Sequence, residues 1–435
     1  CGFLVTWLSN SQEGSWADVA GIYAQRYDVN GDVNGDEFHV NTYTSQLQSS
    51  PSATSLGDGG FIVTWQSDQQ DGDWFGIFAQ RYDGNGDANG DEFQVNTYTT
   101  SLQSDPSTAS LSDGGFVVTW NSYGQDGSEF GIYAQRYDAS GGVNGAEFQV
   151  NTYTDNYQTQ PSTAALSDGG FVVTWQSDQQ DGSGYGIYAQ RYDVNGSAKG
   201  HEFQVNTHAT FTQISPSTSA LNDGGFIVTW RSELQDGSGG GIYAQRYDAS
   251  GDANGTEFLV NTYTSDTQSN PSTTTLSDGG FVVTWQSEGQ DGDGNGIYSQ
   301  RYDAQGYALS EVTLNRPPTL SAVIADTSTN EDAAYSYDAS SNFLDADSDD
   351  TIAYSATLSD DSPLPIWLSI DSSTGVLSGA PANDDVGAIA VKVTATDSAS
   401  MSVSDTYTLT INNTNDAATI TAADASISED AATVS

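Results

Sequence analysis

The chain is dominated by the octapeptide DGGFVVTW, which recurs with small changes and ends each time in tryptophan. From Trp65 onward these tryptophans are 55 residues apart, and the interval before Trp65 is 58 residues because segment 8–25 has three additional residues. A fixed period of this length predicts that one supersecondary unit is stacked repeatedly. The tryptophans are Trp7, Trp65, Trp120, Trp175, Trp230 and Trp285.

Each repeat contains four short segments rich in β-branched and aromatic residues, separated by Gly, Asp, Asn and Ser. In residues 161–207 they are PSTAA, FVVTWQS, GIYAQRYD and EFQVNT. This pattern is typical of strands and turns, and SDGG and YDxNG supply glycines for hairpin turns. We therefore expect four antiparallel strands per repeat.

Four-stranded repeats favour an all-β fold, a β-propeller of four-stranded 55-residue blades with at least six units. The first unit lacks its first strand. A β-solenoid is the alternative, but four-stranded meanders bury both faces between neighbours more naturally than short coils do. Because strand direction alternates, the long loops, second to third and fourth to first, should share one face.

The composition is strongly acidic, with 58 acidic and 10 basic residues and a formal net charge of −48. Such a surface repels nucleic acid and anionic membranes and concentrates cations. The one cysteine, Cys1, excludes an intrachain disulfide. We find no apolar run of about 18 residues and no signal peptide, so we expect no membrane insertion. The chain starts inside a repeat, which suggests a piece of a longer protein.

A repeated arginine stands in the AQRYD or SQRYD segment of each repeat. Residues i and i+2 of a strand share a side, so we predict a structural ion pair such as Arg191 with Asp193. One group per repeat cannot by itself form an asymmetric active centre. We predict that the repeated tryptophan is also structural, in the core. The arginines are Arg26, Arg81, Arg136, Arg191, Arg246 and Arg301.

The long loops carry the most promising binding residues. Fourth-to-first loops contain NTYT followed by glutamine, with His208 in place of the tyrosine once, and second-to-third loops contain carboxylates such as Asp71 and Asp181. Aromatic rings beside amides and carboxylates suit sugars, whereas the alternative is that the rings cover gaps between blades. The predicted ligand-binding residues are Trp16, Trp74, Phe75, Phe130, Tyr185, Tyr43, Tyr98, Tyr153 and Tyr263.

Alternating Asp and Asn in the early YDxNGD turns, such as residues 28–36, match the first half of a calcium loop. An EF-hand would require glutamate where the chain has His39 or Gln94. We expect solvated hairpins instead.

The repeats end at Pro317 and Pro318, a stiff boundary. The following sequence, particularly WLSIDSSTGVLSG, resembles the cadherin-like, dystroglycan-type immunoglobulin-fold domains of large bacterial surface proteins. This resemblance implies a β-sandwich with Trp367 in or near its core. NEDAA recurs as SEDAA in the last residues. We predict a β-propeller repeat domain over 1–315, a cadherin-like β-sandwich over 316–416, and the start of a second, truncated module over 417–435.

The resemblance also implies Ca²⁺ near the junction between such domains. Calcium takes six to eight oxygen ligands, and carboxylates alternate from Asp345 onward. The alternative is an ordinary acidic loop. The predicted metal ligands are Glu331, Asp345, Asp347, Asp397 and Asp416.

The 55-residue repeats resemble those of giant secreted adhesins that also carry cadherin-like and RTX-type calcium modules. This implies an extracellular or bacterial cell-surface location. We predict an adhesin fragment whose long-loop face binds glycans or cell-surface components, on a calcium-stiffened stalk. Alternatives are a self-associating structural or filament subunit and, third, a propeller glycoside hydrolase. The Asp-box of sialidases, SxDxGxTW, does not match in spacing, so we predict no enzyme and no catalytic residues.

Overall fold

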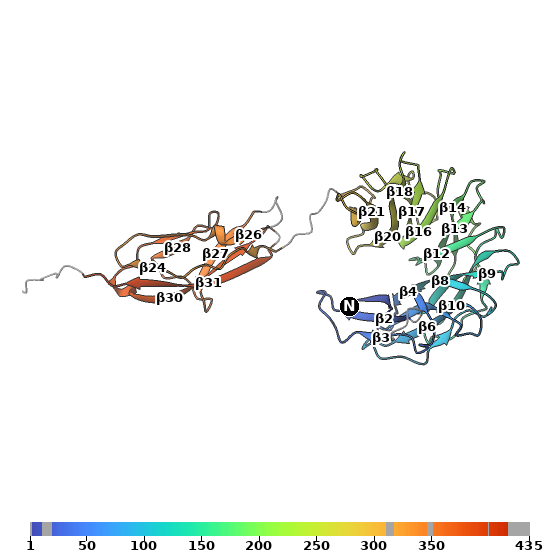
Figure 1. Cartoon of the computed structure of the whole chain (residues 1–435), viewed down its shortest axis with the longest axis horizontal. Helices are drawn as coiled ribbons and strands as arrows, with labels where there is room; N and C mark the ends of the chain where they lie inside the picture. The colour runs from blue at the N-terminus through green and yellow to red at the C-terminus, as the bar shows by residue number, and fades with distance from the viewer. Residues whose placement is uncertain (1, 11–19, 310–316, 346–350, 399, 416–435) are drawn as a thin grey trace, which may run out of the picture. The chain divides into compact units, whose positions relative to one another are not determined.

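The structure is a computed structural model that describes residues 2–10, 20–309, 317–345, 351–398 and 400–415. The chain divides into two compact units, the repeat region, Cys1–Glu311, and the C-terminal unit, Val312–Ser435 (Figure 1). The helices in the described residues are two short 3-10 turns, η1 (Ser340–Asn342) and η2 (Asn383–Asp385). Neither is long or apolar enough to cross a membrane.

The repeat region consists of consecutive antiparallel sheets, one per repeat. The first sheet has three strands, four complete sheets follow, and the last has three described strands. The strands are β1 (Phe3–Ser9), β2 (Gly21–Tyr27), β3 (Phe38–His39); β4 (Gln48–Ser55), β5 (Phe61–Asp68), β6 (Phe75–Tyr82), β7 (Phe93–Gln94); β8 (Gln103–Ser110), β9 (Phe116–Tyr123), β10 (Phe130–Tyr137), β11 (Phe148–Gln149); β12 (Gln158–Ala165), β13 (Phe171–Asp178), β14 (Tyr185–Tyr192), β15 (Phe203–Gln204); β16 (Gln213–Ala220), β17 (Phe226–Glu233), β18 (Gly240–Tyr247), β19 (Phe258–Leu259); β20 (Gln268–Thr275), β21 (Phe281–Glu288) and β22 (Asn295–Tyr302).

The predicted all-β repeats of four strands are confirmed, and so are the glycine turns. In the turn between β4 and β5, Gly59 has a φ of 87°, which favours glycine. A Cβ on the next residue, Gly60, would lie 2.2 Å from the carbonyl oxygen of Tyr82. The first glycine therefore makes the turn, and the second leaves room for the end of the adjacent strand β6.

Consecutive sheets pack face to face through two different surfaces. We call the side that carries Trp65 and its equivalents the Trp face, and the side that carries Ile77 and its equivalents the Ile face. Ile62, Ile77 and Ala79 of the second sheet pack against Trp120 of the third, and the same contact recurs along the region. Trp65, Trp120, Trp175 and Trp230 are fully buried, which confirms the predicted core role of the repeated tryptophan.

The sheets follow one another around an arc, with the inner strands β4, β8, β12, β16 and β20 towards its centre (Figure 1). The two terminal sheets each leave one face uncovered. Ile297 on the last Ile face is 78% exposed, whereas its equivalent Ile242 is fully buried. Phe3 on the first Trp face is 54% exposed, whereas its equivalent Phe116 is 1% exposed.

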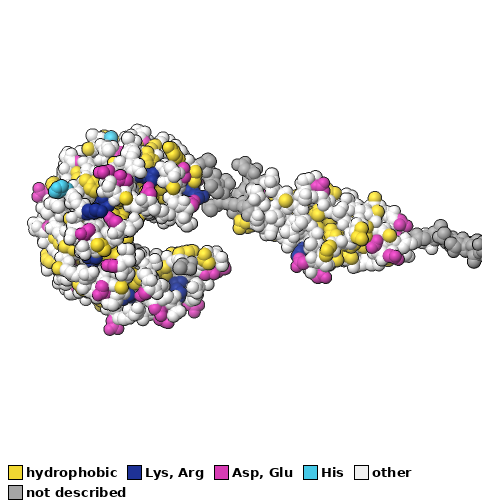
Figure 2. Space-filling view, turned by 180° about the vertical axis from the view of Figure 1, so that it is seen from behind, with side chains coloured by type: hydrophobic (Ala, Val, Ile, Leu, Met, Phe, Trp, Pro, Cys, Tyr) yellow, Lys and Arg dark blue, Asp and Glu magenta, His cyan; other side chains and the backbone are white. Residues whose placement is uncertain are grey.

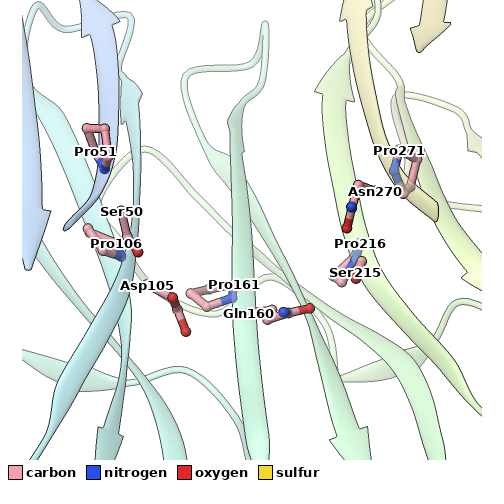
Figure 3. Close-up of a pocket in the computed structure, with 10 residues that line it drawn as sticks. All are labelled: Ser50, Pro51, Asp105, Pro106, Gln160, Pro161, Ser215, Pro216, Asn270 and Pro271. Atoms are coloured by element: carbon pink, nitrogen blue, oxygen red, sulfur yellow. The ribbon is translucent and has the colours of Figure 1, made fainter. Parts of the chain in front are cut away.

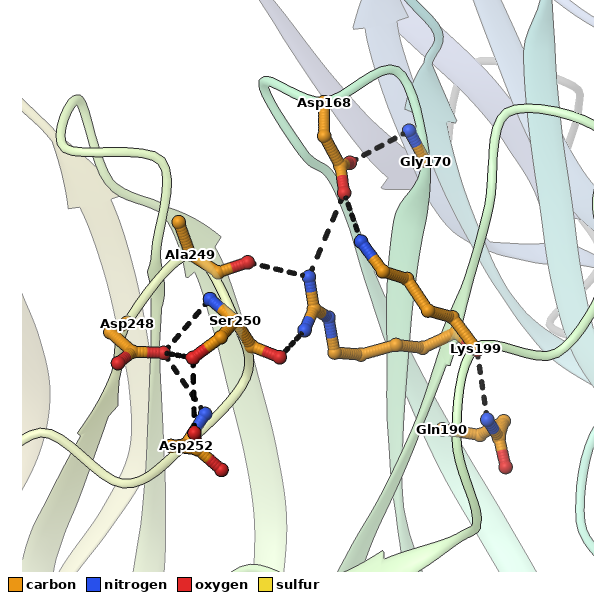
Figure 4. Close-up of polar contacts among 9 residues, drawn as sticks. Asp168, Gly170, Gln190, Lys199, Asp248, Ala249, Ser250 and Asp252 are labelled. Atoms are coloured by element: carbon orange, nitrogen blue, oxygen red, sulfur yellow. Dashed lines mark hydrogen bonds and ion pairs between the residues drawn. The ribbon is translucent and has the colours of Figure 1, made fainter.

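The repeated arginines of the first five sheets also link consecutive sheets, and the predicted pairing of Arg191 with Asp193 is wrong. Arg191 Nη2 donates to the carbonyl oxygen of Ala249 in the next sheet at 2.9 Å, and Arg191 Nη1 donates to that of Ser250 (Figure 4). Its ion-pair partner is Asp168 of the DGG turn, at 3.7 Å.

Asp193 makes different contacts because it lies beyond β14, which ends at Tyr192. The Asp193 carboxylate accepts hydrogen bonds from the backbone N–H groups of Asn195 and Ser197, at 2.9 and 2.8 Å. The rule that residues i and i+2 share a side of a strand does not apply across a strand end.

The C-terminal unit is a β-sandwich. One sheet has the order β24-β31-β30-β27 and the other β25-β29-β28, with Leu377, Val391 and Leu409 in the core between them. Trp367 packs against this core, as predicted. The strands are β23 (Thr319–Leu320), β24 (Thr327–Asn330), β25 (Tyr335–Asp338), β26 (Phe343–Leu344), β27 (Ala353–Leu358), β28 (Leu368–Ile370), β29 (Val376–Gly379), β30 (Gly387–Thr396) and β31 (Ser402–Asn412).

Candidate functional site

The polar residues that recur in the long loops make structural hydrogen bonds. Asn96 Oδ1 accepts the backbone N–H of Ile77 at 2.7 Å, and Asn96 Nδ2 donates to Gln103 Oε1 at 3.1 Å. Gln103 is fully buried, as are its equivalents. The glutamines that follow NTYT therefore lie inside the sheets and not beside the loop aromatics as exposed amides.

A glutamate in each of the complete sheets ties the preceding long loop to that sheet. Glu147 Oε2 accepts hydrogen bonds from Thr97 N and Oγ1, at 2.6 and 3.0 Å. Glu92, Glu202 and Glu257 make the same contacts. The bases of the long loops are thus fixed, whereas side chains at their tips differ from repeat to repeat.

The predicted ligand-binding aromatics fall into two groups. Trp74 is 66% exposed, and Phe75, Phe130 and Tyr185 are half-buried. The loop tyrosines are also half-buried. Trp16 lies outside the described residues. The loop tyrosines are Tyr43, Tyr98, Tyr153 and Tyr263.

The loop tyrosines adjoin buried rings of the next sheet. Burial, followed by the nearby Asp126, Glu147 and Tyr98, raises the pKa of Tyr133. Tyr98 therefore lies close to Tyr133, at the joint between two sheets. This position supports the alternative in which these rings cover gaps.

One group of aromatic residues departs from the repeat. Tyr123 and Phe130 have ring centroids 5.1 Å apart at 73°, and Phe130 and Tyr157 have centroids 6.1 Å apart. Tyr123 and Tyr157 are each 38% exposed. We call these three residues the aromatic cluster.

Carboxylates surround the aromatic cluster. A hydrogen bond to the Glu129 side chain raises the pKa of Tyr123. The backbone N–H of Asp178 donates to the carbonyl oxygen of Tyr157 at 2.8 Å, and Asp178 pairs with Tyr185 across β13 and β14, so Tyr185 lies beside the cluster. Burial, followed by the nearby Asp178 and Tyr157, raises the pKa of Tyr185. The cluster is therefore an amphipathic surface of partly exposed rings with acceptor groups at its edge.

Sequence reasoning missed Tyr123 and Tyr157, although the repeat itself marks them. Where Tyr123 stands, the other repeats have Asp, Glu or, in the first repeat, Asn, and where Tyr157 stands they have Leu or Thr. Comparison of each repeat with its neighbours would have identified both positions.

A second feature missed by sequence reasoning is a hollow of about 350 Å³ at the centre of the arc. Each of five inner strands contributes two residues to its lining, a proline and the residue before it (Figure 3). The inner strands shift register there, and the residues before proline have positive φ, from 51° to 56°. Such backbone is strained for residues other than glycine, and strain of this kind clusters at functional sites. The five pairs begin at Ser50, Asp105, Gln160, Ser215 and Asn270.

Asp105 is the one carboxylate among the residues that line the hollow. Its backbone N–H donates to Gln66 Oε1 at 2.9 Å. Burial raises the pKa of Asp105, and a hydrogen bond with the Asn121 side chain opposes this shift. The other residues that line the hollow are uncharged.

The YDxNGD turns are closed by their own carboxylates. Asp83 Oδ1 accepts the backbone N–H groups of Asn85 and Asp87 at 2.8 and 3.0 Å. Across the described parts of the chain, no three His, Cys, Asp or Glu residues come together as a metal site.

The predicted calcium ligands of the C-terminal unit do not converge. Glu331 is 2% exposed, and its Oε1 accepts hydrogen bonds from Asn413 Nδ2 and Thr414 N, just beyond the end of β31. Asp397 Oδ1 accepts the N–H of Met401, just before β31 begins. An eleven-residue strand separates them by roughly 35 Å.

Of the remaining predicted ligands, Asp345 is the one that belongs to the described residues. Asp345 is half-buried after β26, and Asp347 and Asp416 lie outside the described residues. The described carboxylates therefore do not make a single calcium site. Glu331 Oε2 is nevertheless buried without a hydrogen-bond partner among the described residues, as a carboxylate oxygen reserved for a cation would be.

The C-terminal unit has a recognisable family. Residues 317–412 match the family model described as "Putative Ig domain". The β-sandwich is therefore an Ig-like domain. None of the curated proteins compared with the chain matches it.

Solved structures similar to the chain share little sequence with it. A protein of unknown function from Dyadobacter fermentans is 11% identical, with 66% of this chain and 85% of that chain covered and a TM-score of 0.47. An endo-arabinase from Bacteroides thetaiotaomicron is 12% identical, with 57% and 92% covered and a TM-score of 0.35. A sucrose-6-phosphate hydrolase from Lactobacillus gasseri is 9% identical, with 85% and 86% covered and a TM-score of 0.37. Likenesses this distant assign neither activity nor ligand.

The raised pKa of Asp105 predicts a pH-dependent effect of Asp105→Asn. The folded state binds the Asp105 proton more tightly than the unfolded state, so the ionised carboxylate destabilises the fold above its folded pKa. Asp105→Asn should raise the melting temperature at pH 7, and this gain should shrink as the pH falls towards about 3.

Asp83→Asn is the matched control because the backbone N–H groups of Asp87 and Asn85 lower the pKa of Asp83. The Asp83 carboxylate has the opposite effect on stability. It stabilises the fold above the ordinary pKa of aspartate, and this contribution is lost as the pH falls below that value, so Asp83→Asn should lower the melting temperature at pH 7. A gain from Asp105→Asn that is equal at both pH values would contradict the assignment.

Proposed function

We propose that the repeat region is a propeller-type recognition module of a secreted or cell-surface adhesin, and that it binds a carbohydrate through the aromatic cluster. The stacked four-stranded sheets, whose inner strands line one hollow, support the propeller part of this proposal. The Ig-like domain would act as a spacer.

The observation that carries this proposal is the aromatic cluster itself. Tyr123 and Tyr157 interrupt an otherwise regular repeat, and both rings stay partly exposed next to Phe130. Apolar ring faces of a sugar stack on such rings, while its hydroxyls donate to Glu129 and Asp178. A surface that only closed a joint between sheets would not require two exposed tyrosines.

The charge of the protein narrows the ligand class. Acidic side chains are spread over both units, with few basic ones among them (Figure 2). A field of this sign repels sulfated, phosphorylated or sialylated glycans. We therefore expect neutral oligosaccharides.

We propose binding without hydrolysis. Glycoside hydrolases use a pair of carboxyl groups about 5 to 9.5 Å apart. The hollow offers Asp105 alone among its lining residues.

A second candidate is a structural subunit that assembles through its terminal sheets. The uncovered Ile face at Ile297 and the uncovered Trp face at Phe3 are the two halves of the contact that joins the internal sheets. Large apolar surfaces of this kind mark association sites.

The recognition proposal is tested with the full chain on a panel of neutral and acidic oligosaccharides, followed by calorimetric titration of those that bind. Replacement of both Tyr123 and Tyr157 by alanine should weaken binding by at least about tenfold. Tyr307→Ala is the control because Tyr307 is 72% exposed and lies outside the cluster. Equal losses in both variants, or binding to no oligosaccharide, would refute the proposal. Concentration-dependent assembly without glycan binding would support the second candidate.

We also propose calcium at the end of the Ig-like domain that carries Glu331, with Glu331 Oε2 as a ligand and Asp416 as a further one. The orphaned, buried Oε2 atom supports this site. A bound ion would offset the cost of burying that charge.

Calcium should then stabilise the folded Ig-like domain within the full chain by about 2.7 kcal/mol at a free concentration of about 100 times Kd. This gain should appear as a higher temperature of the domain's calorimetric transition. Glu331→Gln should abolish the rise. A transition that chelator leaves unchanged in the unmodified protein would remove the metal assignment.

A further inference from the structure

At its long-loop end, each sheet closes with one pair of residues, the last of its second strand and the first of its third. These closing pairs differ from sheet to sheet, whereas the strands behind them repeat closely. Both side chains of a pair lie on one side of the sheet, because they stand directly opposite each other in an antiparallel ladder. In the second, third and fourth sheets the closing pairs are Asp68–Phe75, Tyr123–Phe130 and Asp178–Tyr185.

The third-strand member of these three pairs is an aromatic ring that faces the next sheet. Phe75 lies two residues before Ile77 in β6, so its side chain is on the Ile face, towards the third sheet. The equivalent Phe130 has its ring centroid 6.1 Å from that of Tyr157, which precedes β12 of the fourth sheet. Phe75, Phe130 and Tyr185 are each half-buried. We call these three rings the ring row.

The ring row extends the aromatic cluster in both directions. Phe130 belongs to the cluster, and Phe75 and Tyr185 hold the equivalent place in the sheets before and after it. Packed sheets lie about 10 Å apart, which is longer than one sugar ring. Each outer ring has a carboxylate opposite it, Asp68 or Asp178, that can accept hydrogen bonds from hydroxyl groups. A ring beside an acceptor suits one sugar residue, so the row offers a series of such positions.

The fifth sheet ends the ring row. Its closing pair is Glu233–Gly240, and Arg231 lies where the ring would be, because a Cβ on Gly240 would be 2.2 Å from Arg231 Nε. Arg231 Nη2 also lies 3.8 Å from Glu233 Oε1, so the carboxylate of this pair has a cation beside it. In the fourth sheet the equivalent of Arg231 is Gln176, and the ring of Tyr185 is present. The fifth sheet therefore lacks both the ring and the free acceptor.

We propose that the ring row binds an internal stretch of a neutral polysaccharide, so that one chain crosses the joints that follow the second, third and fourth sheets. This inference rests on the proposed function, because the aromatic cluster forms the middle of the row. The central joint, with its three rings, supplies most of the affinity, and each outer joint adds a further position for a sugar residue. A chain held along its length needs no free end, so the site recognises a polymer and not a terminal sugar.

The dependence of affinity on chain length tests this inference. The probes are neutral malto-, cello-, manno- and xylo-oligosaccharides, from the disaccharide to the octasaccharide, titrated calorimetrically against the full chain. In the series that binds, affinity should rise by at least about tenfold between the disaccharide and the hexasaccharide. The reason is that only the longer chains reach the outer rings.

Matched substitutions in the outer closing pairs separate the rings from the fold. Phe75→Asn and Tyr185→Asn each introduce the residue that the last sheet carries as Asn295, which forms the same closing pair with Glu288. Each variant should bind the hexasaccharide at least about threefold more weakly and show a flatter dependence on chain length. The control is Asn295→Ala, beyond the end of the row, which should leave the affinity unchanged.

A double variant tests where the row ends. Arg231→Gln with Gly240→Tyr copies the residues of the fourth sheet into the fifth, and should extend the rise in affinity to longer oligosaccharides. A folded double variant with the length dependence of the unmodified chain would contradict the ring row.

Two outcomes distinguish this inference from the proposed function. Binding that requires Tyr123 and Tyr157 but does not change with chain length, or that Asn295→Ala weakens as much as Phe75→Asn does, would overturn the ring row and leave the proposed function standing. Binding to no oligosaccharide would overturn both.

Discussion

The repeat region depends on one contact, the packing of a tryptophan from each sheet against the Ile face of the sheet before it. The indole ring of Trp120 is fully buried among Ile62, Ile77 and Ala79. A single sheet with two apolar faces could not remain in water alone, so its stability comes from its neighbours. This explains why DGGFVVTW is repeated so closely: any change at the tryptophan would disturb two sheets.

Hydrogen bonds on the two faces of the stack also join consecutive sheets. On the short-turn face, Arg191 reaches the backbone of the next sheet at Ala249 and Ser250. On the long-loop face, Glu147 holds the loop that precedes its sheet at Thr97. Since both links recur, the scaffold leaves few positions free, and those are where the repeats differ. Tyr123, Tyr157 and Asp105 are such positions, and each belongs to a candidate site.

Much of this fold could be predicted from the sequence because its signals are local. Glycines in SDGG and YDxNG fixed the turns, and hydrophobic segments fixed the strands. The partner of Arg191 could not be predicted by spacing, because its contacts are with a turn and with the next sheet. The register shift at Asp105 depends on how two strands pair, which no single segment encodes.

The candidate site shows the same limit. The departures at Tyr123 and Tyr157 are visible in the sequence, but their contact with Phe130 requires a strand end and a loop from the next repeat to meet. Similarly, five carboxylates predicted as one calcium set include Glu331 and Asp397, which the sandwich places at opposite ends of β31. In both cases the sequence indicated which residue types could form a site. Which of these residues lie close together depends on how the strands are connected.

Hydrogen exchange along the repeat region tests most directly whether sheet-on-sheet packing supplies the stability. The internal strands β9, β10, β13 and β14 belong to sheets covered on both faces, whereas the terminal β2 and β21 belong to sheets with one uncovered face. The account predicts markedly slower exchange in the internal strands than at equivalent amides of the terminal ones. Equal protection in all sheets would contradict it, because each sheet would then be stable without its neighbours.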